Sequence, residues 1–230
     1  MKRILRAIAL LLDYPSEELK THISEVREDL NSDPSLSAKE RAMLEPLLVS
    51  FERDTLLELQ VTYSDVFDSS RTMSLNLFEH IHGDNSERGQ AMLDLGEEYM
   101  QQGYYMQRNE LPDYIPMFLE FVSCLPDADA RDWLSQPAHV FAVLAQRLDE
   151  HKSAYAGLFH LLLKFAGIKP DAKAVQELIA RHKKAEEKSI DEEWEEEPIT
   201  FMATPPKTRT SGIVDRLKAA GKLISSSSDS

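Results

Sequence analysis

The sequence predicts an all-α fold, a single-domain helical bundle of about nine helices followed by a disordered C-terminal tail. The 230 residues include only 8 glycines, so glycine-rich sheet turns and phosphate-binding loops are scarce. Leu, Ala, Glu and Met favour helix, whereas Val and Ile are few and scattered, which argues against a large buried sheet. A hydrophobic content of 42% and a charged content of 29% are typical of a globular protein with one sizeable core.

Residues 2–13 form the first predicted helix. Its apolar side chains share one helical face and are Ile4, Leu5, Ile8, Leu11 and Leu12. An apolar run after two basic residues is also typical of a signal peptide, but Arg6 interrupts the run, Asp13 ends it, and no small-residue cleavage site follows. We therefore expect a core helix and, because no other segment is long enough to span a bilayer, a cytoplasmic protein.

Three more helices are expected before residue 70. A proline suits the first turn of a helix over 15–31. Ser37 and Glu40 fit a capping box that opens the next helix, which we expect to extend to Phe51. The last of the three covers 54–68.

The stretch from Tyr63 to Leu119 interrupts this regular helical pattern. The elements expected after 68 are a helix over 71–81, a break over 82–86, a helix over 87–102, a loop over 109–113 and a helix over 114–124. The same stretch holds many carboxylates beside Met and Tyr side chains, which suits a groove for an apolar, basic peptide. A helical core with a solvated acidic face explains this composition equally well.

The longest periodic pattern runs from Phe141 to Phe165 with spacings of three and four, and predicts one long helix or two stacked helices that end at Gly167. His151 lies on this apolar stripe, so we expect a hydrogen-bonded histidine in the core. A last helix is predicted over 171–188.

The compact domain is predicted to span 1–188, and the residues over 189–230 form an acidic and then Pro- and Ser-rich tail. Residues 213–223 within the tail are basic and amphipathic.

Net charge and cysteine usage exclude several classes of protein. A net charge of −14 disfavours binding to nucleic acid or anionic lipid and favours a basic partner such as a cationic peptide. The single cysteine, Cys124, forms no internal disulfide and is expected to be a small buried hydrophobe in an apolar run. The sequence holds no Gly-x-Ser-x-Gly elbow and no glycine-rich loop at a helix start, so no enzyme class is indicated.

Glu79, His80 and His82 are candidate metal ligands. Helical metal sites place ligands three or four residues apart, so that both side chains face one ion. His80 and His82 are two residues apart, about 200° around a helix, which favours a hydrogen-bonded polar turn instead. A metal- or cofactor-binding protein that uses these histidines and nearby carboxylates stays open as an alternative function.

Several motifs, taken together and in order, resemble the NarJ family, the assembly chaperones of respiratory nitrate reductase within the all-helical molybdoenzyme maturation chaperones. The motifs are LLDYP at 11–15, YSDVFD at 63–68, LFEHIHGD at 77–84, RGQAM at 88–92, ELPD at 110–113 and WEEE at 194–197.

The resemblance implies a dedicated chaperone and not an enzyme. Such proteins bind the N-terminal peptide of the nitrate reductase alpha subunit, which resembles a vestigial twin-arginine leader. They keep the alpha subunit soluble until molybdopterin guanine dinucleotide has been inserted, and then release it for membrane anchoring. The chaperone itself keeps no cofactor, does not associate stably with the membrane and is absent from the finished enzyme. The client of this chain is expected to be a nitrate reductase, with a different molybdoenzyme as an alternative.

The resemblance also suggests site residues. Glu110, Pro112 and Asp113 resemble the wider group's Glu-x-Pro-x-Asp-His-like signature, which is associated with the peptide and maturation site, but Tyr114 stands where many relatives have His. The full set expected to bind the client peptide is Tyr63, Phe67, Arg71, Glu79, His80, His82, Asp84, Arg88, Met92, Glu110, Pro112, Asp113 and Tyr114.

Overall fold

The computed structural model describes residues 1–82, 87–106, 110–170, 172–173, 175–180 and 182. Within these residues the regular secondary structure is helical, apart from one isolated antiparallel bridge between Asn76 and Tyr114. The predicted all-α fold is therefore confirmed.

The elements follow one another in chain order. They are α1 (Lys2–Leu12), α2 (Glu17–Thr21), α3 (Ile23–Ser32), α4 (Ala38–Arg53), α5 (Leu56–Phe67), the 3₁₀-helix η1 (Arg71–Met73), α6 (Leu77–His82), α7 (Glu87–Gln101), α8 (Ile115–Cys124), α9 (Asp127–Ser135), α10 (Ala138–Glu150) and α11 (Ala156–Ala166).

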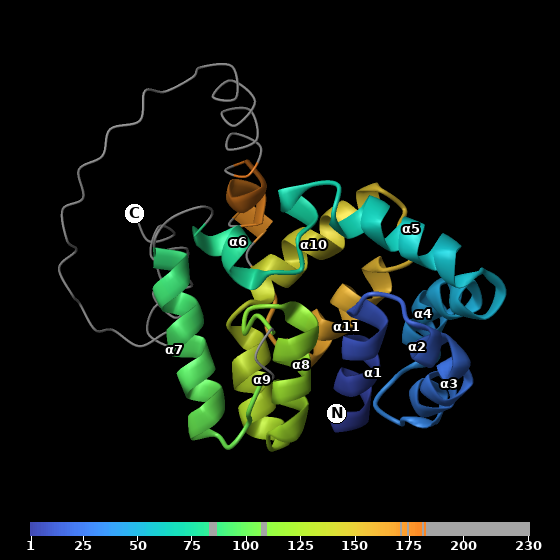
Figure 1. Ribbon diagram of the computed structural model, residues 1–230, viewed down its shortest axis with the longest axis horizontal. Coiled ribbons are helices and arrows are strands. Elements are labelled where there is room, and N and C mark those ends of the chain that lie inside the picture. Colours follow the sequence, from blue (N-terminus) through green and yellow to red (C-terminus); the bar gives the residue numbers. More distant parts are fainter. Residues whose placement is uncertain (83–86, 107–109, 171, 174, 181, 183–230) are drawn as a thin grey trace.

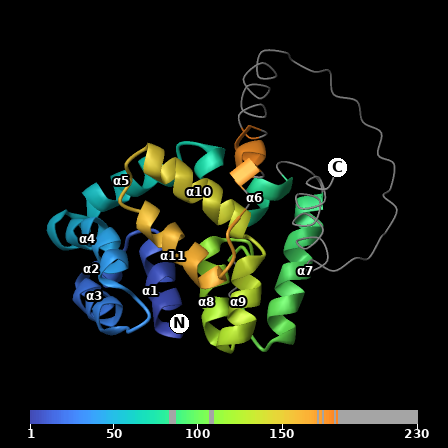
Figure 2. The ribbon, with the colours of Figure 1, turned by 180° about the vertical axis from the view of Figure 1, so that it is seen from behind.

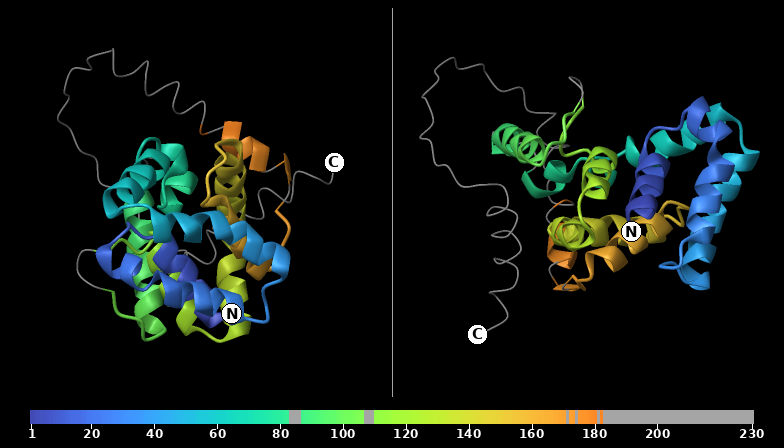
Figure 3. Two further views of the ribbon diagram at one scale, coloured as in Figure 1. Left: turned by 90° about the vertical axis from the view of Figure 1, so that its right-hand side faces the viewer. Right: turned by 90° about the horizontal axis from the view of Figure 1, so that it is seen from below.

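Helix α1 is the centre of the fold (Figure 1). It packs along α8, and Arg6 Nε donates a hydrogen bond to Ser123 Oγ at 3.3 Å. Helices α2–α5 lie on one side of this pair and α7 lies on the other, with α8 and α1 between them (Figure 3). Seen from behind, α11 passes in front of the pair and α10 lies above it (Figure 2). A Cβ atom on Gly157 would lie 2.8 Å from the Met43 carbonyl oxygen, so only glycine permits this approach of α11 to α4.

Several predicted boundaries are confirmed by the helix caps. Ser37 and Glu40 form the expected capping box, because the Ser37 hydroxyl accepts from the Glu40 N–H and the Glu40 carboxylate accepts from the Ser37 N–H. Thr55 and Glu58 form a second one at the start of α5. Gly167 ends α11 with φ 68°, a conformation that glycine adopts without strain.

Other boundaries differ from the prediction. The helix expected over 15–31 is two helices, α2 and α3, because the backbone of His22 leaves the helical region, with ψ 13°. The helix expected over 71–81 is a 3₁₀ turn followed by α6, and the link between them forms the bridge to Tyr114. Helix α9 was not predicted at all.

The periodic pattern from Phe141 to Phe165 is resolved as two helices, α10 and α11, joined by a turn. The expectation of a core histidine at 151 is wrong, because His151 is the C-cap of α10 and is exposed. Of the helix predicted over 171–188, the described residues are helical. Its remaining residues and the predicted tail over 189–230 lie outside the described part of the chain.

The expectation that Cys124 is buried is also wrong. Of the nine residues that precede it in α8, all except Glu120 are buried, and the last of them, Ser123, is 1% exposed. Cys124 is the last residue of the helix, one step of about 100° further around the axis, and its side chain is exposed.

Candidate functional site

Two tyrosine hydroxyls bring three of the sequence motifs together. The Tyr63 hydroxyl donates to the Leu12 carbonyl oxygen at 3.0 Å and lies 3.1 Å from the Tyr114 hydroxyl. The Tyr114 hydroxyl in turn donates to the Asp13 carboxylate at 3.0 Å. Burial is the main cause that raises the pKa of both tyrosines above the ordinary value, so both stay protonated. The motifs at 11–15, 63–68 and 110–114 thus meet at one place, which we call the tyrosine junction.

Aromatic rings extend the junction into the core. Tyr63 contacts Tyr14 with ring centroids 5.4 Å apart and contacts Phe67 at 4.9 Å. Phe67 and Tyr155 also lie 4.9 Å apart, in an edge-to-face arrangement. Tyr63 and Phe67 are each 4% exposed, so they support the surface and present little area of their own to a partner.

Asp113 links the 110–113 motif to α6. Its carboxylate accepts from the Phe78 N–H at 3.2 Å, and its carbonyl oxygen accepts from the Leu77 N–H at 2.9 Å. These N–H groups belong to the first turn of α6 and have no acceptor within that helix, so Asp113 acts as its cap. Burial raises the pKa of the fully buried carboxyl, an effect that the Phe78 N–H and Arg88 oppose.

Helix α7 is held at the same loop. Arg88 pairs with Glu79 at 3.0 Å and approaches Asp113 at 3.8 Å. The buried Tyr99 hydroxyl donates to the Pro112 carbonyl oxygen at 2.8 Å. The segment over 110–114 therefore connects α1, α5, α6 and α7, which explains why the motifs lie far apart in sequence and close together in space.

The expected site residues divide by exposure. Tyr63, Phe67, His80, Pro112 and Asp113 are buried, and Glu79, Arg88, Met92 and Tyr114 are half-buried. Arg71 on η1 and Glu110 are exposed. Asp84 and the His82 side chain lie outside the described residues.

His80 serves α6 from within the core. It is 2% exposed, and its Nε2 atom lies 2.8 Å from the Ser74 carbonyl oxygen, so this nitrogen acts as a donor. Burial is the main cause that lowers the His80 pKa to about 3, so the ring is neutral at pH 7. Among the described residues, no three His, Cys, Asp or Glu side chains gather as a metal site would require.

Exposed apolar side chains near the junction were not singled out by the sequence reasoning. Leu10 is 45% exposed, Tyr14 48% and Leu111 46%. Tyr14 lies against Tyr63, and Leu111 accepts a backbone hydrogen bond from the Tyr114 N–H at 3.1 Å. The motif at 11–15 contains Tyr14, and this was the available signal in the sequence.

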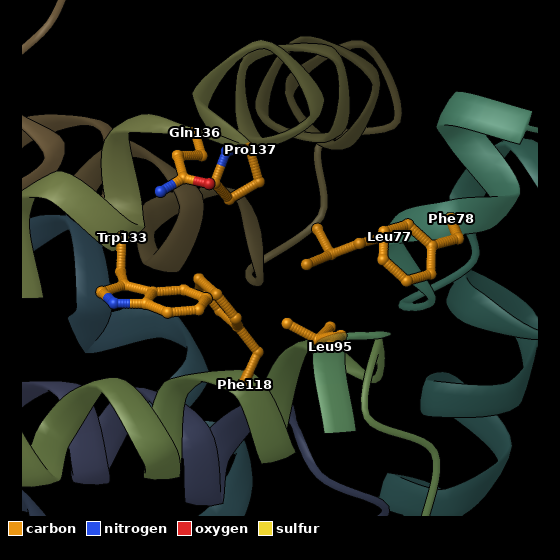
Figure 4. Close-up of a pocket in the computed structure, with 7 residues that line it drawn as sticks. All are labelled: Leu77, Phe78, Leu95, Phe118, Trp133, Gln136 and Pro137. Carbon is orange, nitrogen blue, oxygen red and sulfur yellow. The ribbon is translucent and has the colours of Figure 1, made fainter. Parts of the chain in front are cut away.

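Two cavities lie on either side of this framework. The smaller one is lined by the rings of Phe78, Phe118 and Trp133, by Leu77 and Leu95, and by Gln136 and Pro137, which surround a hollow between α6, α7, α8 and α9 (Figure 4). Its volume is ≈ 10 Å³ and the surface that faces it is apolar, so we assign it no ligand. The larger cavity, ≈ 500 Å³, lies beside α5 and the turn between α10 and α11.

No helix among the described residues combines the length and apolar character needed to cross a bilayer. Such a helix needs about 20 predominantly apolar residues.

Comparison with known proteins gives consistent results. The sequence profile of the nitrate reductase delta subunit family matches residues 33–160. The chain is 38% identical over 197 residues to the nitrate reductase molybdenum cofactor assembly chaperone NarJ of Escherichia coli strain K12, covering 85% of this chain and 84% of that protein. It is 36% identical over 201 residues to the protein of the same strain named "Probable nitrate reductase molybdenum cofactor assembly chaperone NarW", covering 87% of this chain and 84% of that protein.

A solved structure shares the fold. The crystal structure of a redox enzyme maturation protein from Archaeoglobus fulgidus superposes with a TM-score of 0.52 and 24% identity, and the match covers 73% of this chain and 94% of that one.

Proposed function

The chain belongs to the nitrate reductase delta subunit family, the NarJ family of nitrate reductase maturation chaperones, and from this premise we propose that it assists molybdenum cofactor assembly in a nitrate reductase. The relatives are named as chaperones and not as catalysts, so the chain is a maturation protein and not an enzyme. The family match supports this function more directly than any other observation. The exposed apolar side chains and carboxylates at the tyrosine junction support the proposed binding site of the client.

The proposed ligand is the N-terminal peptide of the catalytic alpha subunit. The peptide binds across the tyrosine junction, where Leu10, Tyr14 and Leu111 offer apolar area beside the carboxylates of Asp13 and Glu110. Apolar side chains of the peptide pack on Leu10, Tyr14 and Leu111. Its basic side chains face the carboxylates of Asp13 and Glu110. Charge pairs at such a rim set the association rate and the choice of partner more than they set affinity.

The buried members of the expected site act indirectly. Asp113 is fully buried, so it holds the 110–114 segment against α6 and α7 and does not meet the peptide itself. Tyr63, Phe67, His80 and Pro112 have the same supporting role, whereas Tyr114 and Glu110 are accessible for contact. Glu79, Arg88 and Met92 border this framework, and Arg71, His82 and Asp84 complete the proposed set.

The wider proposal follows the family resemblance. The chaperone holds the alpha subunit in the cytoplasm while molybdopterin guanine dinucleotide is inserted into it, keeps no cofactor itself, and leaves before the enzyme is anchored at the membrane. A net charge of −14 fits a partner with a basic N-terminal segment and disfavours nucleic acid and anionic lipid.

Isothermal titration calorimetry with a synthetic peptide of the alpha-subunit N-terminus tests the binding step. We expect Glu110→Lys to weaken binding by about tenfold, which is about 1.4 kcal/mol. Glu97→Lys, at an exposed carboxylate on α7, is the matched control and should bind as the wild type does. If the wild-type chain gives no heat at tens of micromolar, or if both variants weaken binding equally, the proposed surface is wrong.

A further inference from the structure

The larger cavity touches the tyrosine junction only through Tyr155 in its lining, and the function proposed above does not use it. Its volume of ≈ 500 Å³ falls within the range of about 300–1,000 Å³ that ligand-binding pockets occupy. Its apolar lining includes Leu59, Val66, Met73 and Tyr155, and hydroxyl groups such as those of Thr62 and Ser69 surround this lining.

Helix α5 contributes a continuous part of the cavity lining. Leu59, Thr62 and Val66 line it at spacings of three and four, so one face of the helix forms its wall over about 10 Å. The turn after α10, which includes Lys152 and Ser153, also lines the cavity. A wall of this length fits a segment of polypeptide better than a compact small molecule, because grooves between helices accept amphipathic segments.

Charge limits which segment fits. Residues 54–70 contain the carboxylates of Asp54, Glu58, Asp65 and Asp68 and no Lys or Arg. Asp54 and Asp65 line the cavity itself, where Lys152 is the one basic side chain apart from His151. This balance disfavours phosphate-bearing ligands and favours a cationic segment with apolar side chains.

This chain contains a segment of that chemistry. Residues 207–223 hold five basic residues, Lys207, Arg209, Arg216, Lys218 and Lys222, against one acid, in a chain whose net charge is −14. Ile213 and Leu217 are four residues apart, as on one face of a helix. The 24 residues over 183–206 reach at most about 80 Å when extended, whereas a domain of this size has a radius of gyration of about 16 Å. The segment can therefore reach the cavity from His182.

We propose that the cavity beside α5 binds the chain's own basic segment over 207–223. Ile213 and Leu217 enter the apolar lining, and the basic side chains face Asp54, Asp65 and the other carboxylates of α5. Covalent linkage gives the segment an effective concentration on the order of millimolar, so a weak contact is enough to keep the cavity occupied. The docked segment packs on Tyr155, which contacts Phe67 and Tyr63 with centroids 4.9 Å and 6.1 Å apart. The aromatic cluster thus connects the docked tail to the tyrosine junction, where the client is proposed to bind.

Hydrogen exchange on the full-length chain tests the proposal without any client. A full-length variant with the five basic residues replaced by Gln should exchange several-fold faster over 59–73 and 151–155 than the wild type, with no change in α7. The difference should vanish in high salt, because exposed charge pairs are screened.

A binding experiment identifies the surface. A labelled synthetic peptide of residues 207–223 is titrated into the five-Gln full-length variant and followed by fluorescence anisotropy. Adding Asp65→Lys should weaken binding about tenfold, whereas Glu97→Lys on α7, an equally exposed carboxylate, should not. The proposal is wrong if the peptide does not bind. It is also wrong if Asp65→Lys and Glu97→Lys weaken binding equally, because binding is then a general attraction to an acidic surface.

The client peptide is the competing occupant. If adding it protects 59–73 and 151–155 while the five-Gln substitution changes nothing, the cavity belongs to the client and the proposal fails. Loss of client binding alone would contradict the proposed function and leave this inference standing.

Discussion

The Tyr63 hydroxyl lies 3.1 Å from the Tyr114 hydroxyl, 51 positions further along the chain. Tyr63 also reaches the Leu12 carbonyl oxygen, and Tyr114 reaches the Asp13 carboxylate. Two hydroxyl hydrogens thus serve three contacts, because each tyrosine donates only one hydrogen. The contact joins the end of α1, the middle of α5 and the start of α8, which makes the tyrosine pair central to both stability and the proposed client surface.

Tyr63→Phe should lower the free energy of unfolding by about 1 kcal/mol, because the Leu12 carbonyl at the end of α1 then loses its donor. Urea denaturation measures this loss. Tyr105→Phe is the control, since that side chain is 78% exposed. If the two variants are equally stable, the junction contributes nothing to the fold.

His80 should make stability depend on pH in the acid range. Its folded pKa of about 3 lies below the ordinary value of 6.5, so between these values the unfolded chain binds more protons and stability falls as the pH is lowered. Between pH 7 and pH 5 the wild type should lose about 2 kcal/mol relative to His80→Gln, which keeps a donor for the Ser74 carbonyl but does not titrate. Urea denaturation of both proteins at the two pH values measures the difference. Parallel pH profiles would show that His80 titrates normally.

Asp113 should make stability depend on pH in the opposite direction to His80. Burial raises its folded pKa above the ordinary value of 3.8. Between 3.8 and the folded pKa the folded chain therefore binds more protons than the unfolded chain, and the contribution of Asp113 to stability falls as the pH rises. The stability of the wild type minus that of Asp113→Asn should therefore be greatest at low pH. It should decline by at most about 1.4 kcal/mol per pH unit and then stay constant above the folded pKa. Calorimetric melting of both proteins from pH 3 to 7 checks this, and a difference that grows with pH would contradict it.

Cys124 should react with a thiol reagent in native buffer, because it is exposed. Titration with Ellman's reagent should release one equivalent per chain without denaturant, since Cys124 is the only cysteine. Cys124→Ser should release none. If Cys124 reacts only after denaturant is added, the thiol is buried and this prediction is wrong.

The sequence predicted the helices that carry an apolar stripe and a cap, such as the one opened by Ser37 and Glu40. It did not reveal α9, because that segment buries only Ala130 and Leu134 and its acidic first turn resembles a loop. Asp127 and Asp129 in that turn were the available signal, since carboxylates stabilise a helix N-terminus.

The site was predictable as a set of motifs but not as a geometry. Asp113 was expected to bind the client peptide, yet it is fully buried and accepts a hydrogen bond from the Phe78 N–H, 35 positions away in the sequence. The pattern of neighbouring residues in the sequence contains no information about a hydrogen bond between residues so far apart. Cys124 was misplaced for a different reason: it lies four residues after the exposed Glu120 and shares its outward face, a spacing that the surrounding apolar run obscured.

The backbone bridge between Asn76 and Tyr114 lies at the base of the segment that carries α6 and α7. The chain leaves the bundle at Leu77 and returns at Asp113, and the hydrogen bonds from Leu77 N–H to the Asp113 carbonyl and from Ile115 N–H to the Leu75 carbonyl close this excursion at its base. A segment tied at both ends can open and reclose as one cooperative unit while α1 stays packed on α8. Residues 77–113 are therefore expected to behave as a foldon with a smaller free energy of opening than the central helices.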